Sequence, residues 1–417
     1  MKVFKFGGAS LQNVASIKNI ARIIQNYGPK ERLIVVLSAM GKTTDNLESI
    51  FNAYKTEEDY PDMIYHLKKY HLSICNNLFE NRYDRVFYRV EKLFSDLEAE
   101  FRKGDKNFAR LYDQTVCYGE LLSSYIFSAY LAQEGVNNQW LDARKYIQTD
   151  DNWKEGIVDW AWSEKLMKSD LPDLMKGQIL VTQGFLGGTV SEKTATLGRE
   201  GSDFSAAIFA YCLDAESVTI WKDVPGILNA DPRRIHNTCL FSQLPYKEAA
   251  EMTYYGATVI HPKTIKPLAI KKIPLYVKSF IHPEEAGTCI GEVEEYDTIP
   301  AIIFKPNQSI IRFEQKDYSS VNQSNLSQVF NLLAANNVKI NLMKSSAISF
   351  SICANTEKEK FEIISERLSD DFYIDFYHGL ELITIKNYNE DSLSKFSRKT
   401  IYWEQKTRNI YQIVRES

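Results

Sequence analysis

The chain has 417 residues, 44% of them hydrophobic and 25% charged, a composition typical of a globular protein with two or more domains. The formal net charge is −4 and basic residues are scattered among acids, which excludes the basic surface of a nucleic-acid-binding protein. The six cysteines lack Cys-x-x-Cys spacing and no apolar run approaches about 18 residues. We therefore expect buried thiols, no zinc site, no membrane contact and a cytoplasmic location.

The N-terminus is predicted to form a short strand over residues 3–6 that leads directly into Gly7 and Gly8. Adjacent glycines let backbone N–H groups approach a phosphate, and Lys5, on the strand just before them, adds a positive charge. An ordinary tight turn is the alternative interpretation. The opening therefore indicates one half of a possible anion site.

A second strand is predicted over residues 33–37, followed by the sequence Ser-Ala-Met-Gly-Lys-Thr. This ending is similar to a P-loop, but Val36 stands inside the strand where a P-loop needs its first glycine, so we reject that interpretation. The hydroxyls of Ser38 and Thr43 remain suited to a phosphoryl or carboxylate ligand. The alternative is that Thr44 or Asp45 caps the helix that follows.

Residues 57–132 change to a long helical periodicity and are predicted to be a helical insertion. Around this insertion, short strands rich in β-branched residues alternate with helices. The predicted strands cover residues 3–6, 33–37, 179–184, 218–221 and 274–277. This alternation predicts a doubly wound, mostly parallel α/β sheet with polar ligands at the carboxyl ends of its strands.

A glycine-rich segment, residues 196–205, follows the strand at 179–184. Arg199 offers a bidentate fork for a carboxylate, and Asp203 can accept from an amine or orient donors at a helix N-terminus. An amino acid carries both groups. The alternative is a turn in which Asp203 is only an N-cap and Arg199 a surface residue.

Two further turns follow the strand at 218–221 and contain Asp-Val-Pro-Gly and Asp-Pro-Arg. They would present Lys222, Asp223 and Arg233 to a nucleotide whose phosphates reach towards the paired glycines. Taken alone, these turns would be unremarkable.

Beyond Pro300 the pattern changes to smaller α/β units, with the boundary placed in the turn-rich segment 292–300. Strands are predicted at residues 309–313, 339–343, 348–353, 372–377, 380–385 and 410–414, and helices at 325–336 and 358–368. This pattern indicates a small module appended to a larger one.

The motifs KFGGAS, LSAMGKTT, YGELLSS, QGF with LGREGSD, WKDVPGI with NADPR, and YYGATVIHPKT occur in this order. Together they resemble the aspartate kinases of the amino acid kinase family, over nearly the whole chain. The resemblance implies a three-layer αβα sandwich in residues 1–296 and an α+β region of ACT type in residues 297–417. Within the latter, the first unit covers about 305–376 and a shortened second unit about 377–417.

The resemblance implies ATP-dependent phosphorylation of the β-carboxylate of L-aspartate to 4-phospho-L-aspartate, the first step towards lysine, threonine and methionine. It assigns Ser38, Thr43, Glu120, Phe185, Arg199, Ser202 and Asp203 to the amino acid. It assigns Lys5, Gly7, Gly8, Lys222, Asp223, Arg233 and Lys263 to ATP, with Lys5, Gly7, Gly8 and Asp203 as the catalytic set. Mg²⁺ is expected on the ATP phosphates, without protein ligands. No general base is needed, because a carboxylic acid with a pKa of about 3.9 is already ionised.

Several positions depart from the family pattern. Ala9 replaces a threonine, and Thr258 replaces a lysine for which Lys263 or Lys222 is the candidate substitute. Asn341 and Ala347 stand where lysine-sensing relatives have acidic residues, so weak or absent inhibition by lysine is expected. The ACT-type region also implies a homodimer or higher homo-oligomer. The competing hypothesis is a regulatory, amino-acid-sensing subunit that has lost catalysis.

Overall fold

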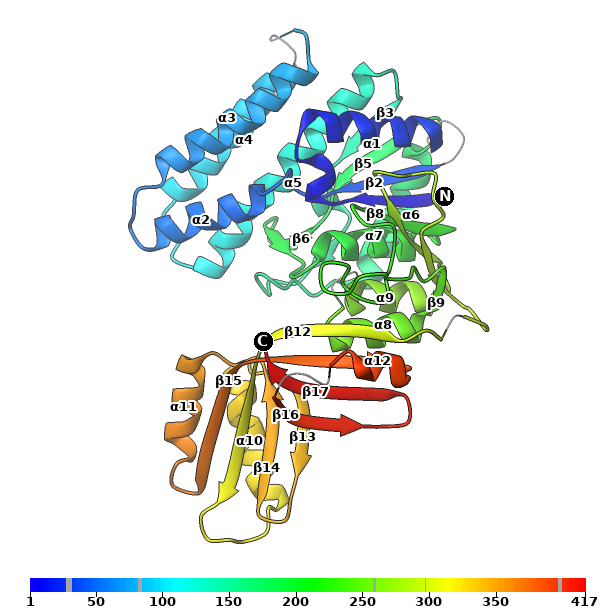
Figure 1. The fold of residues 1–417 in the computed structure, drawn as a ribbon. Coiled ribbons are helices and arrows are strands. Elements are labelled where there is room, and N and C mark those ends of the chain that lie inside the picture. Colours follow the sequence, from blue (N-terminus) through cyan, green and yellow to red (C-terminus); the bar gives the residue numbers. More distant parts are fainter. Residues whose placement is uncertain (28–31, 82–84, 258–259, 297, 397–399) are drawn as a thin grey trace. The chain divides into compact units, whose positions relative to one another are not determined.

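The computed structural model describes residues 1–27, 32–81, 85–257, 260–296, 298–396 and 400–417 (Figure 1). Thr258, one of the departures from the family pattern, lies outside these residues. The chain forms two compact units. The first comprises Met1–Ile227, Leu240–Ala250 and Val259–Tyr296, and the second comprises Leu228–Cys239, Glu251–Thr258 and Asp297–Ser417. Two short segments from the middle of the chain therefore belong to the C-terminal unit.

The first unit is built on an eight-stranded sheet in the order β3-β5-β2-β1-β8-β10-β11-β9. Its strands are β1 (Lys2–Phe6), β2 (Leu33–Leu37), β3 (Asn138–Leu141), β5 (Ile179–Gln183), β8 (Ser217–Lys222), β9 (Gln243–Pro245), β10 (Leu275–Ser279) and β11 (Thr288–Gly291). All neighbours are parallel except β10 and β11. The five predicted strands are confirmed, and the carboxyl ends of β1, β2, β5 and β8 meet at one edge of the sheet.

Helices cover both faces of this sheet (Figure 1). The helices described in residues 1–296 are α1 (Val14–Tyr27), α2 (Thr43–Lys55), α3 (Pro61–Leu78), α4 (Arg85–Arg102), α5 (Phe108–Gln133), α6 (Trp160–Leu174), α7 (Gly201–Cys212), α8 (Tyr246–Tyr255) and α9 (Pro262–Ile270). Phe4 and Phe6 of β1 join the buried cluster formed with α1 to α5. Lys5, between them, faces the opposite side, where α7 packs on β1, β2 and β8. The predicted three-layer sandwich is confirmed, and α3, α4 and α5 account for the helical insertion.

The small strands β4 (Gln148–Thr149), β6 (Leu186–Thr189) and β7 (Thr194–Thr196) form a separate three-stranded sheet that the sequence did not predict. The alternative in which Thr44 or Asp45 caps α2 is wrong, because the N-cap is Lys42 and no side chain caps it. Asp45 instead lies in the first turn of α2, where a negative charge is favoured by the helix dipole.

The second unit is a six-stranded antiparallel sheet in the order β13-β14-β12-β15-β17-β16. Its elements are β12 (Ala301–Gln315), α10 (Gln323–Ala335), β13 (Ile340–Ser345), β14 (Ser349–Ala354), α11 (Lys358–Leu368), β15 (Phe372–Lys386), α12 (Glu390–Ser394), β16 (Ile401–Lys406) and β17 (Ile410–Glu416). Helices α10 and α11 pack on one face through the cluster that contains Phe313 and Phe350. This β-rich architecture fits the predicted ACT-like region.

Two predictions for the second unit are wrong. The strands expected at 372–377 and 380–385 are one continuous strand, β15. The intervening Gly379, at φ 72°, looks like a break in the sequence, but a register shift opposite Gln308 absorbs it. The second error is that strand β16 was not predicted. Among the described residues between β15 and β16, the only helix is the five-residue α12.

The cysteines agree only in part with the expectation of buried thiols. All six are free, and four are buried, but Cys289 is half-buried and Cys239 is exposed. Within the described part of the chain, no helix has both the length and the apolar content needed to cross a membrane.

Candidate active site

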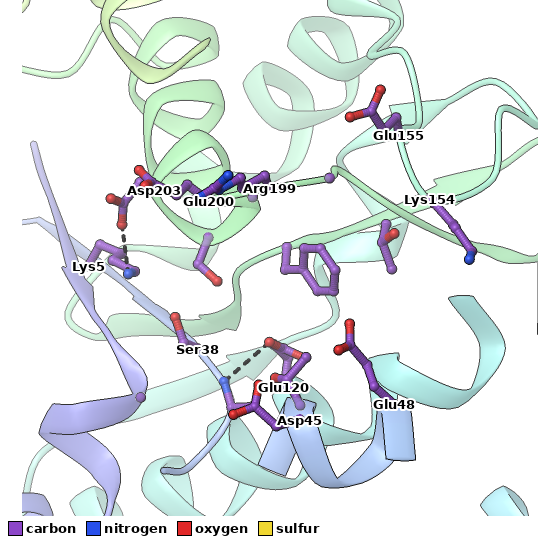
Figure 2. Close-up of a pocket in the computed structure, with 18 of the residues that line it drawn as sticks. Lys5, Ser38, Asp45, Glu48, Glu120, Lys154, Glu155, Arg199, Glu200 and Asp203 are labelled. Carbon is purple, nitrogen blue, oxygen red and sulfur yellow. Dashed lines mark hydrogen bonds and ion pairs between the residues drawn. The ribbon is translucent and has the colours of Figure 1, made fainter. Parts of the chain in front are cut away.

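A cavity of about 690 Å³ opens at the carboxyl edge of the first unit's sheet (Figure 2). Its walls come from the ends of β1, β2 and β8 and from α2, α5 and α7. Nine of the residues assigned from the sequence line it: Lys5, Gly8, Ser38, Glu120, Phe185, Arg199, Ser202, Asp203 and Lys222. Residues up to 217 positions apart therefore share one cavity, because parallel strands bring their carboxyl ends together.

One end of the cavity holds two lysines around one carboxylate. The Nζ atom of Lys5 lies 2.6 Å from Oδ1 of Asp203, and Nζ of Lys222 lies 3.7 Å from Oδ2. Burial alone would raise the pKa of Asp203, but the charges of Lys5 and Lys222 outweigh burial and hold this pKa below its ordinary value. The cluster carries a net positive charge, which suits phosphate oxygens.

The glycine opening lies beside the loop that follows β2. A Cβ atom on Gly8 would come within 3.0 Å of the carbonyl oxygens of Ala39 and Gly41, so only glycine fits there. Gly8 begins a 3-10 turn, Gly8–Leu11, in which the Ser10 hydroxyl donates to the Gly7 carbonyl at 2.6 Å. Ala9 is exposed on this turn, so its missing hydroxyl leaves these contacts unchanged.

A buried carboxylate from α5 lines the cavity near Ser38 (Figure 2). Oε1 of Glu120 accepts from the Ala39 backbone N–H at 3.3 Å, whereas Oε2 has no hydrogen-bond partner among the described residues. Burial raises the pKa of Glu120 to about 8, and this rise is opposed by the Ala39 hydrogen bond and by the charge of Lys5. An orphaned carboxyl oxygen lining a cavity is suited to receive a cation.

The segment before α7 brings a free guanidinium to the cavity. Arg199 is exposed and makes no hydrogen bond or ion pair with any residue that the structure describes. Glu200, in the left-handed conformation at φ 54°, is the N-cap of α7 and provides no side-chain cap. The alternative in which Asp203 serves only as an N-cap is therefore wrong, since Asp203 lies inside the helix and pairs with Lys5.

Close packing holds the end of β5 against α7. A Cβ atom on Gly201 would lie 2.6 Å from the Phe185 ring, and one on Gly184 would lie 2.5 Å from Ser202. Phe185 has φ 68°, and its backbone N–H donates to Oγ of Ser205 at 2.9 Å. These contacts give Phe185 and Ser202 fixed places at the cavity wall.

Five assigned residues do not line the cavity. The Thr43 hydroxyl is fully buried and donates to the Met40 carbonyl at 2.6 Å, while the neighbouring Thr44 lines the wall. The others are Gly7, Asp223, Arg233 and Lys263. Asp223 is exposed, and Nζ of Lys263 lies 3.9 Å from the lining residue Glu155. Arg233 belongs to the second unit, where it pairs with Asp231 at 2.9 Å.

The structure adds lining residues that sequence reasoning missed. They include Asp45, Glu48, Tyr112, Lys154, Glu155 and Glu200. Glu48 lies one helical turn beyond Thr44 and therefore on the same face of α2, so helical periodicity could have identified it as a lining residue. Tyr112, whose hydroxyl donates to Glu48, and Lys154, whose Nζ lies 4.3 Å from the centroid of the Tyr112 ring, belong to no recognisable motif.

A buried aspartate holds the Lys154 loop in place. Oδ2 of Asp113 accepts from the backbone N–H groups of Lys154 at 2.8 Å and Thr196 at 3.1 Å, and Oδ1 accepts from the Thr196 hydroxyl at 2.8 Å. Burial raises the pKa of Asp113 to about 6, and these hydrogen bonds oppose the rise. Asp113 therefore connects α5, the loop and β7.

Asp113→Asn is expected to lower the free energy of unfolding by about 2–3 kcal/mol, because a side-chain amide would turn an N–H group towards buried donors. Urea denaturation measures the change. Asp105→Asn is the matched control, since Asp105 forms a more exposed pair with Arg110. Equal effects of the two substitutions would contradict the role of Asp113.

Comparison with known proteins agrees with this geometry. The family model described as the amino acid kinase family matches residues 1–279. The chain therefore belongs to the amino acid kinase family.

More specific similarity is found to the aspartokinases. Lysine-sensitive aspartokinase 3 of Escherichia coli is 30% identical over 357 residues, which are 85% of this chain and 78% of that protein. The crystal structure of E. coli aspartokinase III with aspartate and ADP, in the R-state, has a TM-score of 0.83 at 26% identity. The match covers 100% of this chain and 96% of the chain in that structure. Within the family, the chain belongs with the aspartokinases.

Other relatives are longer than this chain. The bifunctional aspartokinase/homoserine dehydrogenase of Buchnera aphidicola is 29% identical over 360 residues, which are 83% of this chain but only 43% of that protein. The chain therefore spans about two fifths of the length of this bifunctional relative.

Proposed function

We propose that this protein transfers the γ-phosphoryl group of ATP to the β-carboxylate of L-aspartate, giving 4-phospho-L-aspartate. The observation that carries the proposal is the set of charged groups that line one cavity. Two lysines surround Asp203, and the unpartnered Arg199 and the buried Glu120 supply a cation and an acid for the amino acid. Similarity to the aspartokinases supports the same substrate pair.

In this arrangement Arg199 binds the α-carboxylate of aspartate as a bidentate fork, and Glu120 accepts from the ammonium group. The β-carboxylate then points to the lysine end, where Lys5 offsets charge on the transferring phosphoryl group. Alignment of the two substrates supplies most of the catalysis. The resemblance assigns Lys222, Asp223, Arg233 and Lys263 to the nucleotide, and of these four Lys222 lines the cavity, beside Lys5.

Mg²⁺ carried on the ATP phosphates would supply further charge neutralisation. The cavity fits a hydrated ion, since Oε2 of Glu200 is buried and has no hydrogen-bond partner in the described part of the chain.

Trapping aspartyl phosphate as its hydroxamate tests this function. Purified protein with Mg-ATP and aspartate should form the hydroxamate, whereas glutamate and N-acetylglutamate in parallel reactions should not. If glutamate formed the hydroxamate and aspartate did not, the substrate would be glutamate. Aspartate binding without any hydroxamate would favour the competing hypothesis, a regulatory subunit that has lost catalysis.

Lysine is expected to inhibit the enzyme weakly or not at all. Oδ1 of Asn341 already accepts from Nζ of Lys305 at 2.6 Å, and Nδ2 donates to Gln308 at 2.6 Å. Burial and the nearby charge of Lys339 lower the pKa of Lys305. A further ammonium group would meet the like charge of Lys339, and Asn341 offers it a side-chain amide instead of a carboxylate. Initial rates measured with low-millimolar L-lysine, and with threonine and methionine as controls, check this. A clear inhibition curve with lysine would contradict it.

We also infer a homodimer or higher homo-oligomer formed through the ACT-like region, in a cytoplasmic enzyme. The family resemblance supports the oligomer, and six free cysteines are in keeping with a reducing compartment. Size-exclusion chromatography with light scattering tests the oligomer, and a monomeric mass would exclude it.

A further inference from the structure

The two residues that bind the charged groups of the amino acid in the proposed function stand on different segments. Glu120 lies in α5, and Arg199 lies between β7 and α7, and both line the cavity (Figure 2). An amino acid carries its ammonium and α-carboxylate groups on one carbon atom. Its affinity therefore depends on the separation between the acid and the guanidinium that bind these groups. Whatever fastens the Arg199 segment to α5 sets that separation.

A second acid on α5 provides this fastening. Asp113 stands on the same face of α5 as Glu120, because the two residues are seven positions, or about two helical turns, apart. Its side chain is fully buried and does not line the cavity. Both of its carboxylate oxygens accept from Thr196, the last residue of β7, and Oδ2 also accepts from the Lys154 backbone N–H. Asp113 thus fastens α5 to the chain just before Arg199.

The Lys154 loop extends this constraint to the residue that directly precedes Arg199. The backbone N–H of Gly156 donates to the Thr196 carbonyl at 2.8 Å, which pairs the loop with the end of β7. A Cβ atom on Gly198 would lie 3.4 Å from the Lys154 carbonyl oxygen, so the loop packs against the Gly198 backbone. Gly198 has φ 76°, a conformation that favours glycine. The loop that Asp113 holds therefore supports the turn that leads into Arg199.

The neighbouring Gln114 fastens the other end of β7. Its side-chain amide donates to the Thr194 carbonyl at 2.7 Å and accepts from Thr194 N–H at 3.2 Å. These bonds hold the start of the strand, whereas Asp113 holds the end from which the chain continues to Arg199. The two residues have different tasks, and Asp113 is the one placed to fix the position of Arg199.

We propose that Asp113 is a positioning residue for the amino acid substrate, which holds Arg199 at the separation from Glu120 that aspartate requires. The inference rests on the proposed function, in which Arg199 binds the α-carboxylate and Glu120 the ammonium group. Asp113 itself touches no substrate. Its loss should weaken aspartate binding and leave the lysines around Asp203, and with them Mg-ATP binding and phosphoryl transfer, nearly unchanged.

Asp113→Ala tests the proposal, since it removes all three hydrogen bonds. We expect the Kd of L-aspartate, measured by calorimetric titration, and KM for aspartate to rise about tenfold, in line with one misplaced charged hydrogen bond. KM for Mg-ATP and kcat should stay within about twofold of wild type. Asp113→Asn keeps the side-chain volume and one acceptor oxygen, so it should raise the Kd about threefold. Near-UV circular dichroism identifies folded variants, and Asp113→Asn alone decides the question if Asp113→Ala does not fold.

A double variant separates positioning from a general loss of structure. Arg199→Met alone should raise the Kd of aspartate, and Asp113→Ala should then add less than about twofold, because the position of residue 199 no longer matters. Independent effects that multiply would show that Asp113 acts on the fold as a whole.

Thr115→Val is the matched control. Thr115 is also fully buried in α5, but its hydroxyl donates to the Leu111 carbonyl at 2.8 Å, within the same helix. The substitution removes a buried hydrogen bond without touching the contact between α5 and β7. It should leave the Kd of aspartate unchanged.

An unchanged Kd of aspartate in a folded Asp113 variant would overturn the positioning role, and so would an equal loss of affinity for Mg-ATP. If the wild type bound aspartate but formed no aspartyl phosphate, the proposed catalysis would fail, and the comparison of Kd values would still decide the role of Asp113. Failure of the wild type to bind aspartate at all would overturn both.

Discussion

Lys5→Ala is expected to lower kcat about 10²–10³-fold, the range seen when one preorganised charge or donor is removed from a reacting centre. Lys5 is 8% exposed and is the cation nearest to Asp203, at 2.6 Å. Lys222, at 3.7 Å from the same carboxylate, would retain part of the positive charge but from the neighbouring strand. KM for aspartate should change far less than kcat, because Glu120 and Arg199 remain.

Hydroxamate production under saturating Mg-ATP and aspartate measures this effect. Lys5→Met is a second variant that retains most of the buried side-chain volume, and thermal unfolding identifies any loss of fold. Lys18→Ala, on the exposed side of α1, is the control. A folded Lys5 variant with turnover near wild type would show that Lys5 has no part in phosphoryl transfer.

Glu120→Gln is expected to raise KM for aspartate about 10- to 100-fold at pH 8, because the ammonium group loses a charged acceptor. The glutamine oxygen can still accept from the Ala39 backbone N–H, so the local fold is retained. Since burial raises the pKa of Glu120 to about 8, the free enzyme holds this carboxyl neutral at pH 6. In wild type, KM for aspartate should therefore fall as the pH rises from 6 towards 8, and Glu120→Gln should remove that dependence.

The same pKa has an effect on stability with a definite sign. A carboxyl group whose pKa is higher in the folded than in the unfolded protein stabilises the fold at low pH. This stabilisation is fully present below pH 4.5, the unfolded value, and is lost as the pH rises through about 8. Between pH 5 and pH 8, the free energy of unfolding of the unliganded wild type should therefore fall relative to that of Glu120→Gln. Parallel pH profiles of the two proteins in urea denaturation would contradict the raised pKa.

Much of the fold was predictable because it depends on local patterns. The strands of the first unit are short apolar runs with turn residues behind them, and parallel pairing places their carboxyl ends together. Lys5, Ser38 and Lys222 therefore reach one cavity, as their positions at strand ends indicated. The sequence pattern predicted a strand break at Gly379, but β15 continues through this residue and stays paired with β12.

The site was less predictable wherever a role depends on a partner distant in sequence. Asp203 has the sequence context of an N-cap, and only its contact with Lys5, 198 positions earlier, makes it part of a charge cluster. Thr43 and Thr44 are adjacent, but the start of α2 turns one into the core and the other to the cavity. Asp113 and Lys154 belong to no motif, because their positions are set by packing between α5 and a loop.

The sequence by itself determined the class of the chain, the order of its elements in the first unit, and the residue types of an anion site and an amino acid site. These follow from periodicity, turn chemistry and motif spacing, all of which act over a few residues. Only the tertiary structure decided the burial of Glu120, the pairing of Asp203 with two lysines and the attachment of segment 228–239 to the C-terminal unit. The physical reason is that burial and charge pairing depend on which distant segments come into contact, and that contact is a property of the folded chain alone.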